Sequence, residues 1–146
     1  MTETIGFLLS DTARLLRRRF DERARAIGVT RAQWRALTAL SRAEGINQGA
    51  LAERLEVEPI TLCRMVDRLA EADLVERRRD PADRRAWRIF LTDRARPLLD
   101  ELRVIGGAVT ARALDGLDED ERSALARALE RVRDNLSTES REVAHG

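Results

Sequence analysis

Residues 74–91 read LVERRRDPADRRAWRIFL, and this stretch decides the fold. The runs 74–78 and 86–91 are strand candidates, and the RDPADR segment between them carries Asp-Pro and Ala-Asp pairs, which are typical of turns. Apolar residues lie at the two outer ends of the stretch, whereas arginines and aspartates lie around the turn. The pattern predicts a β-hairpin whose base packs on the protein and whose charged tip projects away from it.

Two short helices are expected immediately before this hairpin. One covers QGALAERL, residues 48–55, and the next begins near Pro59 and runs to about Ala72. Proline suits the first turn of a helix because the N–H group that it lacks has no partner there. Two short helices joined by a few residues form a helix-turn-helix pattern. The expected inward positions are Leu51, Ala52, Leu55, Leu62, Met65, Val66 and Leu69.

Further helices are expected on both sides of this segment. An apolar stripe with steps of three or four residues covers 5–27, and Gly28 is a suitable helix end. Thr30 and Gln33 fit a capping box that opens a second helix, which ends at Gly45.

After the hairpin, Thr92 or Asp93 is expected to cap a helix from about Arg94 to Leu114. The last helix covers 117–136, and a polar tail, 137–146, is expected to be frayed.

The composition favours a mainly helical protein that forms a symmetric dimer. Apolar residues make up 43% of the chain but aromatic residues only 3%, so aliphatic side chains must fill the core. The charged fraction of 36% exceeds the usual quarter and indicates solvated helix faces. The stripes of the first and last helices have little to pack against within one small lobe, and a second copy of the chain would cover them.

Positive charge is concentrated on the hairpin although the whole chain has a net charge of only +1. All 27 basic residues are arginine, a bias that a GC-rich genome explains, so their location is the informative property. Residues 77–96 carry eight arginines against three acidic residues, a net charge of +5, whereas residues 97–146 have a net charge of −4. Such asymmetry indicates that one face contacts a polyanion.

Several protein classes lack support in the sequence. A single cysteine excludes an intramolecular disulfide framework and favours a reducing compartment. The N-terminal segment resembles neither a signal peptide nor a membrane span, so a cytoplasmic protein is expected. We find no nucleophile–base pair, metal cluster or glycine-rich phosphate loop, and therefore expect neither an enzyme nor a bound metal or cofactor. The acidic run 118–121 is interpreted as the opening of a helix.

The stretch LAERLEVEPITLCRMVDRLAEADLVERRRDPADRRAWRIFLT, residues 51–92, resembles the winged helix-turn-helix core of the MarR transcriptional regulators. The matching features are the Leu-Ala-x-x-Leu of the supporting helix, the Val-Asp-Arg-Leu of the recognition helix, Leu-Val-x-Arg, Asp-Pro-x-Asp-Arg-Arg and Leu-Thr. Two positions depart from the family pattern, because Asp73 and Ala95 stand where the family commonly has glycine. Flanking helices that build a dimer are also typical of that family, so the resemblance covers the whole chain.

The resemblance implies a mainly α fold with a small β-hairpin wing. The DNA-binding lobe would cover 29–96, and dimerisation helices would cover 1–28 and 97–136. The implied function is that of a sequence-specific double-stranded DNA-binding transcriptional regulator, a repressor that binds a near-palindromic operator as a homodimer. The alternative is a winged-helix protein-interaction module without DNA binding, against which the arginine-rich wing argues.

The resemblance assigns DNA contacts first to the recognition helix. Thr61 and Arg64 lie on its N-terminal half, which meets base edges, and Arg68 would contact phosphate. The alternative for these arginines is a surface ion pair with a neighbouring acid, Asp67 or Glu71 in the case of Arg64.

The wing is expected to enter the minor groove. Its tip carries Arg84 and Arg85, with Asp83 beside them to orient a guanidinium through an ion pair. At least one of the three arginines at 77–79 is expected to be structural.

The family also implies a small aromatic or phenolic effector, for which Phe20 and Trp34 are the candidate residues. The alternative is that both rings belong to the core. Cys63, the lone thiol, is interpreted as a small helix residue rather than a redox sensor.

Overall fold

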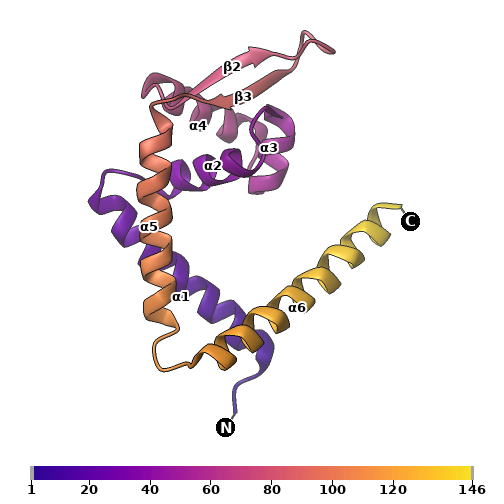
Figure 1. Ribbon diagram of the computed structural model, residues 1–146. Coiled ribbons are helices and arrows are strands. Elements are labelled where there is room, and N and C mark those ends of the chain that lie inside the picture. Colours follow the sequence, from indigo (N-terminus) through magenta and orange to yellow (C-terminus); the bar gives the residue numbers. More distant parts are fainter. Residues whose placement is uncertain (1, 146) are drawn as a thin grey trace. The chain divides into compact units, whose positions relative to one another are not determined.

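A computed structural model describes residues 2–145 of the chain and the side chains of residues 2–138. These residues form a mainly α-helical fold with a small antiparallel sheet (Figure 1), which confirms the expected class. In chain order the elements are α1 (Ile5–Ala26), α2 (Arg31–Arg42), β1 (Ile46–Asn47), α3 (Gln48–Leu55), α4 (Pro59–Glu71), β2 (Val75–Arg79), β3 (Trp87–Leu91), α5 (Ala95–Ala113) and α6 (Glu119–His145). The chain up to Val109 forms one compact unit, and the chain from Thr110 forms a second.

Local signals in the sequence define where the helices begin and end. The capping box of α2 is present, because Gln33 N–H donates to Thr30 Oγ1 at 3.2 Å and Thr30 N–H donates to Gln33 Oε1 at 2.9 Å. Gly28 follows α1 with a φ of +83°, a left-handed conformation that favours glycine. Pro59 occupies the first turn of α4, as its missing N–H group predicts.

The core of the first unit lies between α2, α3, α4 and the base of the hairpin. Its side chains are almost entirely aliphatic, as the low aromatic content predicts. The largest fully buried ones are Leu37, Leu40, Leu51, Leu62, Val66, Leu69 and Ile89. At about 25 cal/mol per Å² of apolar surface, this burial holds the two short helices against the sheet.

The sheet has the strand order β1-β3-β2, and both pairs of strands are antiparallel. Val75 pairs with Leu91 at the base of the hairpin, and Arg79 pairs with Trp87 near its tip. Strand β1 was not predicted, because two residues are too short to show an alternating pattern.

The connection from α4 to β2 passes through Asp73, which has a φ of +61°. A left-handed conformation favours glycine, and aspartate adopts it more readily than most other residues. The Thr92 hydroxyl donates to the Asp73 carbonyl at 2.6 Å, so the turn is fastened to the end of the hairpin.

Of the two C-terminal helices, α5 lies within one residue of its predicted boundaries and α6 extends beyond them. Helix α5 buries Leu99 and Leu102. Helix α6 opens with a capping box, in which Glu121 N–H donates to Asp118 Oδ1 at 2.8 Å, and this confirms the interpretation of the acidic run. It continues to His145, past the predicted end at 136, because no glycine or proline interrupts 117–145. The predicted tail is therefore helical as far as it is described, and its side chains from 139 on lie outside the described residues.

Candidate nucleic-acid interface

Helix α4 presents a polar face with one large apolar side chain. Its opposite face is buried through Leu62, Val66 and Leu69, which leaves Thr61, Arg64 and Arg68 exposed. Ile60 is 66% exposed at the start of the same helix. Within the described residues, the side chains of Arg64 and Arg68 make neither an ion pair nor a hydrogen bond. Both guanidinium groups are thus available to an external partner.

Arg77 of β2 is a structural residue, which confirms that one of the three arginines at 77–79 has this role. Its Nη2 lies 2.6 Å from Asp67 Oδ1 and donates to the Cys63 carbonyl of α4 at 3.1 Å. Its Nε donates to Gln48 Oε1 of α3 at 3.1 Å. The side chain is only 20% exposed. Arg77 therefore fixes the wing against both helices, and it occupies the Asp67 carboxylate that was the predicted alternative partner of Arg64.

The next two arginines lie over the aromatic rings of β3. The guanidinium of Arg78 lies 4.1 Å from the centre of the Phe90 ring, and that of Arg79 lies 4.5 Å from the centre of the Trp87 ring. Arg79 also donates to the carbonyl of Arg84 across the turn. A cation–π contact at an exposed site contributes about 0.5–1 kcal/mol, so these contacts stabilise the hairpin.

The turn of the wing is organised by two aspartates that bind backbone. Asp80 accepts from Ala82 N–H at 2.9 Å and pairs with Arg88 at 3.2 Å. The backbone hydrogen bond from Ala82, followed by the contact with Arg88, lowers the pKa of Asp80 below its usual value. Asp83 accepts from the backbone N–H of Arg85 at 3.0 Å. Among the described residues Asp83 makes no ion pair with a wing guanidinium and instead closes the turn, so its predicted orienting role stays a prediction.

The far end of the wing carries unpaired positive charge. The turn lies away from the helices of its unit (Figure 1). Arg84 and Arg85 are exposed there, and within the described residues neither guanidinium has an ion pair. Among the eight arginines of 77–96, five are engaged within the protein: 77, 78, 79, 88 and 96. Most of these arginines are therefore held by partners within the protein, whereas the two at the tip of the hairpin are available to an external partner.

The candidate effector residues form a packed pair of rings. Phe20 and Trp34 have ring centres 4.6 Å apart at an interplanar angle of 69°, and both pack against the core. Trp34 Nε1 donates to Asp21 Oδ1 at 2.6 Å. The structure accounts for both residues in this way, and their role toward an effector stays a prediction.

Cys63 is half-buried on α4, and its Sγ lies 3.9 Å from the Arg77 guanidinium. Its carbonyl is the group that holds Arg77.

A helix-turn-helix whose second helix exposes arginine, followed by an arginine-tipped hairpin, defines the class of winged helix-turn-helix proteins.

The sequence model of the MarR family matches residues 27–86. The solved structure of the transcriptional regulator PA3341 is 34% identical, with a TM-score of 0.77 over 92% of this chain and 99% of that one. A MarR transcriptional regulator from Methanosarcina mazei is 27% identical, with a TM-score of 0.82 over 92% and 96% of the two chains. MarR from E. coli in its apo form is 26% identical, with a TM-score of 0.83 over 90% and 98%.

The chain belongs to the MarR family of transcriptional regulators. Members of this family are transcription regulators rather than enzymes. Among the described residues, no helix is long and apolar enough to cross a membrane.

Proposed function

We propose that this protein is a sequence-specific double-stranded DNA-binding regulator that acts as a repressor on a near-palindromic operator. The observation that carries the proposal is the set of unpaired arginines on α4 and at the wing tip, which Arg77 holds in one rigid unit. A helix fits the major groove, and a thin wing fits the narrower minor groove, where negative potential is focused.

Each exposed residue has a distinct part in this proposal. Arg64 binds guanine O6 and N7 through its two-pronged guanidinium, and Thr61 contacts a neighbouring base edge or thymine methyl group. Arg68, further along α4, contacts phosphate. Arg84 and Arg85 enter the minor groove.

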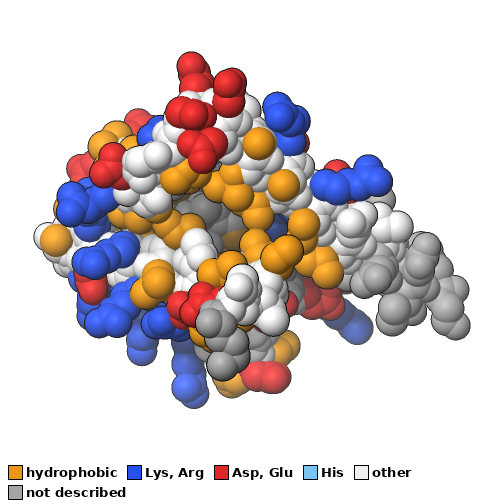
Figure 2. Space-filling model, turned by 90° about the horizontal axis from the view of Figure 1, so that it is seen from below, with side chains coloured by type: hydrophobic (Ala, Val, Ile, Leu, Met, Phe, Trp, Pro, Cys, Tyr) orange, Lys and Arg blue, Asp and Glu red, His pale blue; other side chains and the backbone are white. Residues whose placement is uncertain are grey.

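A homodimer is part of the proposal, because apolar side chains are left exposed on both terminal helices. In α1 the N-terminal half exposes large apolar side chains, with Ile5 76% and Phe7 53% exposed, whereas Ala24 near its C-terminal end is fully buried. In α6, Leu125 is 39% exposed and Leu129 is 41% exposed. Figure 2 shows apolar side chains open to solvent on the face seen from below. A second copy of the chain would remove such surface from water.

A dimer presents two copies of α4, and these must match half-sites roughly 34–36 Å apart on DNA. A small aromatic or phenolic effector that changed this separation would release both half-sites together. Phe20 and Trp34, between α1 and α2, are the residues through which such an effector would act.

The test is a selection experiment with the purified full chain and a random DNA library. We expect enrichment of a sequence with two inverted half-sites. In a gel shift with this sequence, we expect a complex that contains two copies of the protein for each DNA duplex. Failure to enrich any sequence would favour the alternative, a winged-helix module that binds protein.

A further inference from the structure

A second group of arginines lines a hollow on α1 and the start of α2, and it shares no residue with the proposed DNA interface. The hollow has a volume of about 380 Å³ and lies within the first unit. Five arginines and two carboxylates line it, so its walls carry a net charge of +3. This volume is in the range of small-molecule sites.

Arg14 is paired with Asp11 at 2.7 Å, but the other four arginines of the hollow are neutralised weakly or not at all. Arg31 lies 3.9 Å from Asp21, and Arg18 lies 3.6 Å from Glu22, both longer than the 2.7–2.9 Å of a strong charge-assisted hydrogen bond. Within the described residues, the side chain of Arg17 has neither an ion pair nor a hydrogen bond, and the same is true of the Arg25 side chain.

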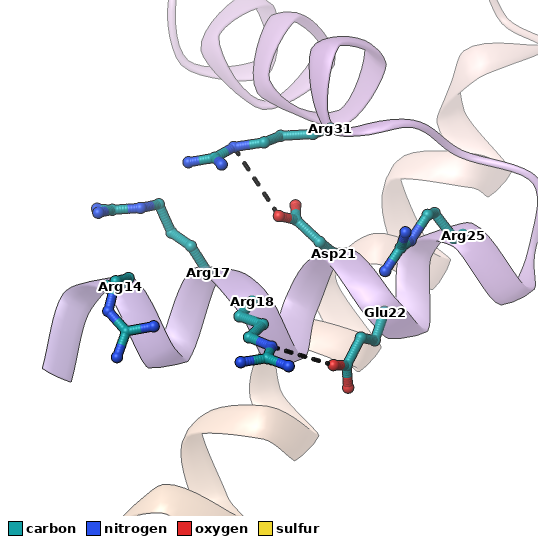
Figure 3. A pocket seen from close by; sticks show the side chains of 7 residues that line it. All are labelled: Arg14, Arg17, Arg18, Asp21, Glu22, Arg25 and Arg31. Carbon is teal, nitrogen blue, oxygen red and sulfur yellow. Dashed lines mark ion pairs between the residues drawn. The ribbon is translucent and has the colours of Figure 1, made fainter. Parts of the chain in front are cut away.

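The geometry brings two of these arginines together from different helices. Figure 3 shows Arg17 of α1 and Arg31 of α2 extending into the same space beside Asp21. Asp21 is 18% exposed and is fixed by Trp34 Nε1 at 2.6 Å, whereas Arg31 is 54% exposed and loosely held. An incoming anion can therefore draw Arg31 toward Arg17 while Asp21 stays in place.

We propose that this hollow binds a small, multiply charged anion of the phosphate-ester or diphosphate class. A guanidinium group can bind a phosphate group through two parallel N–H···O hydrogen bonds. The net charge of +3 on the lining residues favours a ligand with two or more negative charges. All seven lining residues are charged and most of the exposed lining is polar, so the hollow suits an anion better than an apolar aromatic effector. This site is thus distinct in chemistry from the phenolic effector of the proposed function, and it does not depend on DNA binding.

Trp34 provides a reporter for the test. The chain has two tryptophans and no tyrosine, so Trp87→Phe leaves Trp34 as the only indole. Inorganic pyrophosphate is titrated into this variant of the full chain at constant ionic strength. We expect a saturable change in Trp34 emission, and a dissociation constant raised roughly tenfold or more when Arg17→Gln and Arg31→Gln are added.

The matched control is Arg103→Gln, which removes an exposed arginine of α5 outside the hollow and should leave the dissociation constant unchanged. Arg17→Gln alone is a second variant, and it is expected to fold normally because it removes no internal contact. Absence of a saturable change, or equal dissociation constants in Arg17→Gln and Arg103→Gln, would overturn the proposal. Because no DNA is present, either result leaves the proposed DNA binding intact.

Discussion

At the scale of single residues, the partner of each arginine decides its role. Arg64 and Arg77 have the same side chain, yet Arg77 is held by Asp67 and two further acceptors, whereas Arg64 has none within the described residues. Sequence alone could not separate them, since the two further acceptors of Arg77 lie 14 and 29 residues away along the chain. Folding brings Arg77 and its acceptors together, and the spacing of residues along the chain does not reveal this contact.

Arg64→Ala is expected to weaken operator binding by roughly 1–3 kcal/mol and to relax the preference at one base pair in each half-site. The reason is the loss of a two-pronged contact with guanine. Repeating the selection with the variant measures this effect, and Arg103→Ala serves as the control. An unchanged consensus would remove Arg64 from base reading.

Ile60 leads to a second expectation on the same helix. An apolar side chain that is 66% exposed beside Thr61 suits the methyl group of thymine. Ile60→Ala should therefore abolish the difference in affinity between operators with thymine and with uracil at one position, while the wild type keeps it. Equal loss of affinity for both operators in the variant would indicate a packing role instead.

At the scale of elements, the helices and the hairpin were predictable because their signals are local. The capping box at Thr30, the proline at 59 and the Asp-Pro turn each act within a few residues. The detail of the turn was not predictable, since Asp80 and Asp83 both stand near arginines. Backbone geometry decides that Asp80 pairs with Arg88 and that Asp83 binds an N–H group.

The wing tip should contribute to DNA affinity without regard to sequence. Replacing Arg84 and Arg85 with alanine is expected to weaken binding to all duplexes and to reduce the slope of log affinity against log salt by roughly one to two units. Gel shifts over a range of salt concentrations provide the measurement. The same slope in variant and wild type would exclude the wing from the interface.

The turn should also loosen in acid. The pKa of Asp80 is lowered in the folded protein by Ala82 N–H and Arg88, so its stabilisation is present above the unfolded pKa and is lost as pH falls through the folded value. We expect the protection of the Ala82 amide, that is, its hydrogen exchange relative to the intrinsic rate at the same pH, to fall below about pH 4. In Asp80→Asn this protection should be low already at neutral pH and should not change in acid, and a titration of the protection like that of the wild type would contradict the assignment.

At the scale of the whole molecule, the exposed stripes of α1 and α6 predict a dependence of DNA binding on association. Ending the chain before Asp118 removes α6 and its apolar residues. The shortened protein is expected to be monomeric or aggregated and to lose operator affinity, because two linked half-sites bind far more tightly than one. Sedimentation gives the state and a gel shift the affinity. A soluble monomer with full affinity would rule out the dimer while leaving the winged-helix assignment unaffected.

The Arg77 anchor has a kinetic consequence. Because one side chain holds the wing to both α3 and α4, the contacts in the two grooves of a half-site must form and break as one event. The long-range approach to DNA depends on the total charge of the protein, and replacing Arg77 with lysine preserves that charge. The compact ammonium group of lysine cannot, however, reproduce the three contacts that the Arg77 guanidinium makes. Arg77→Lys should therefore leave the association rate nearly unchanged and shorten the residence time on the operator.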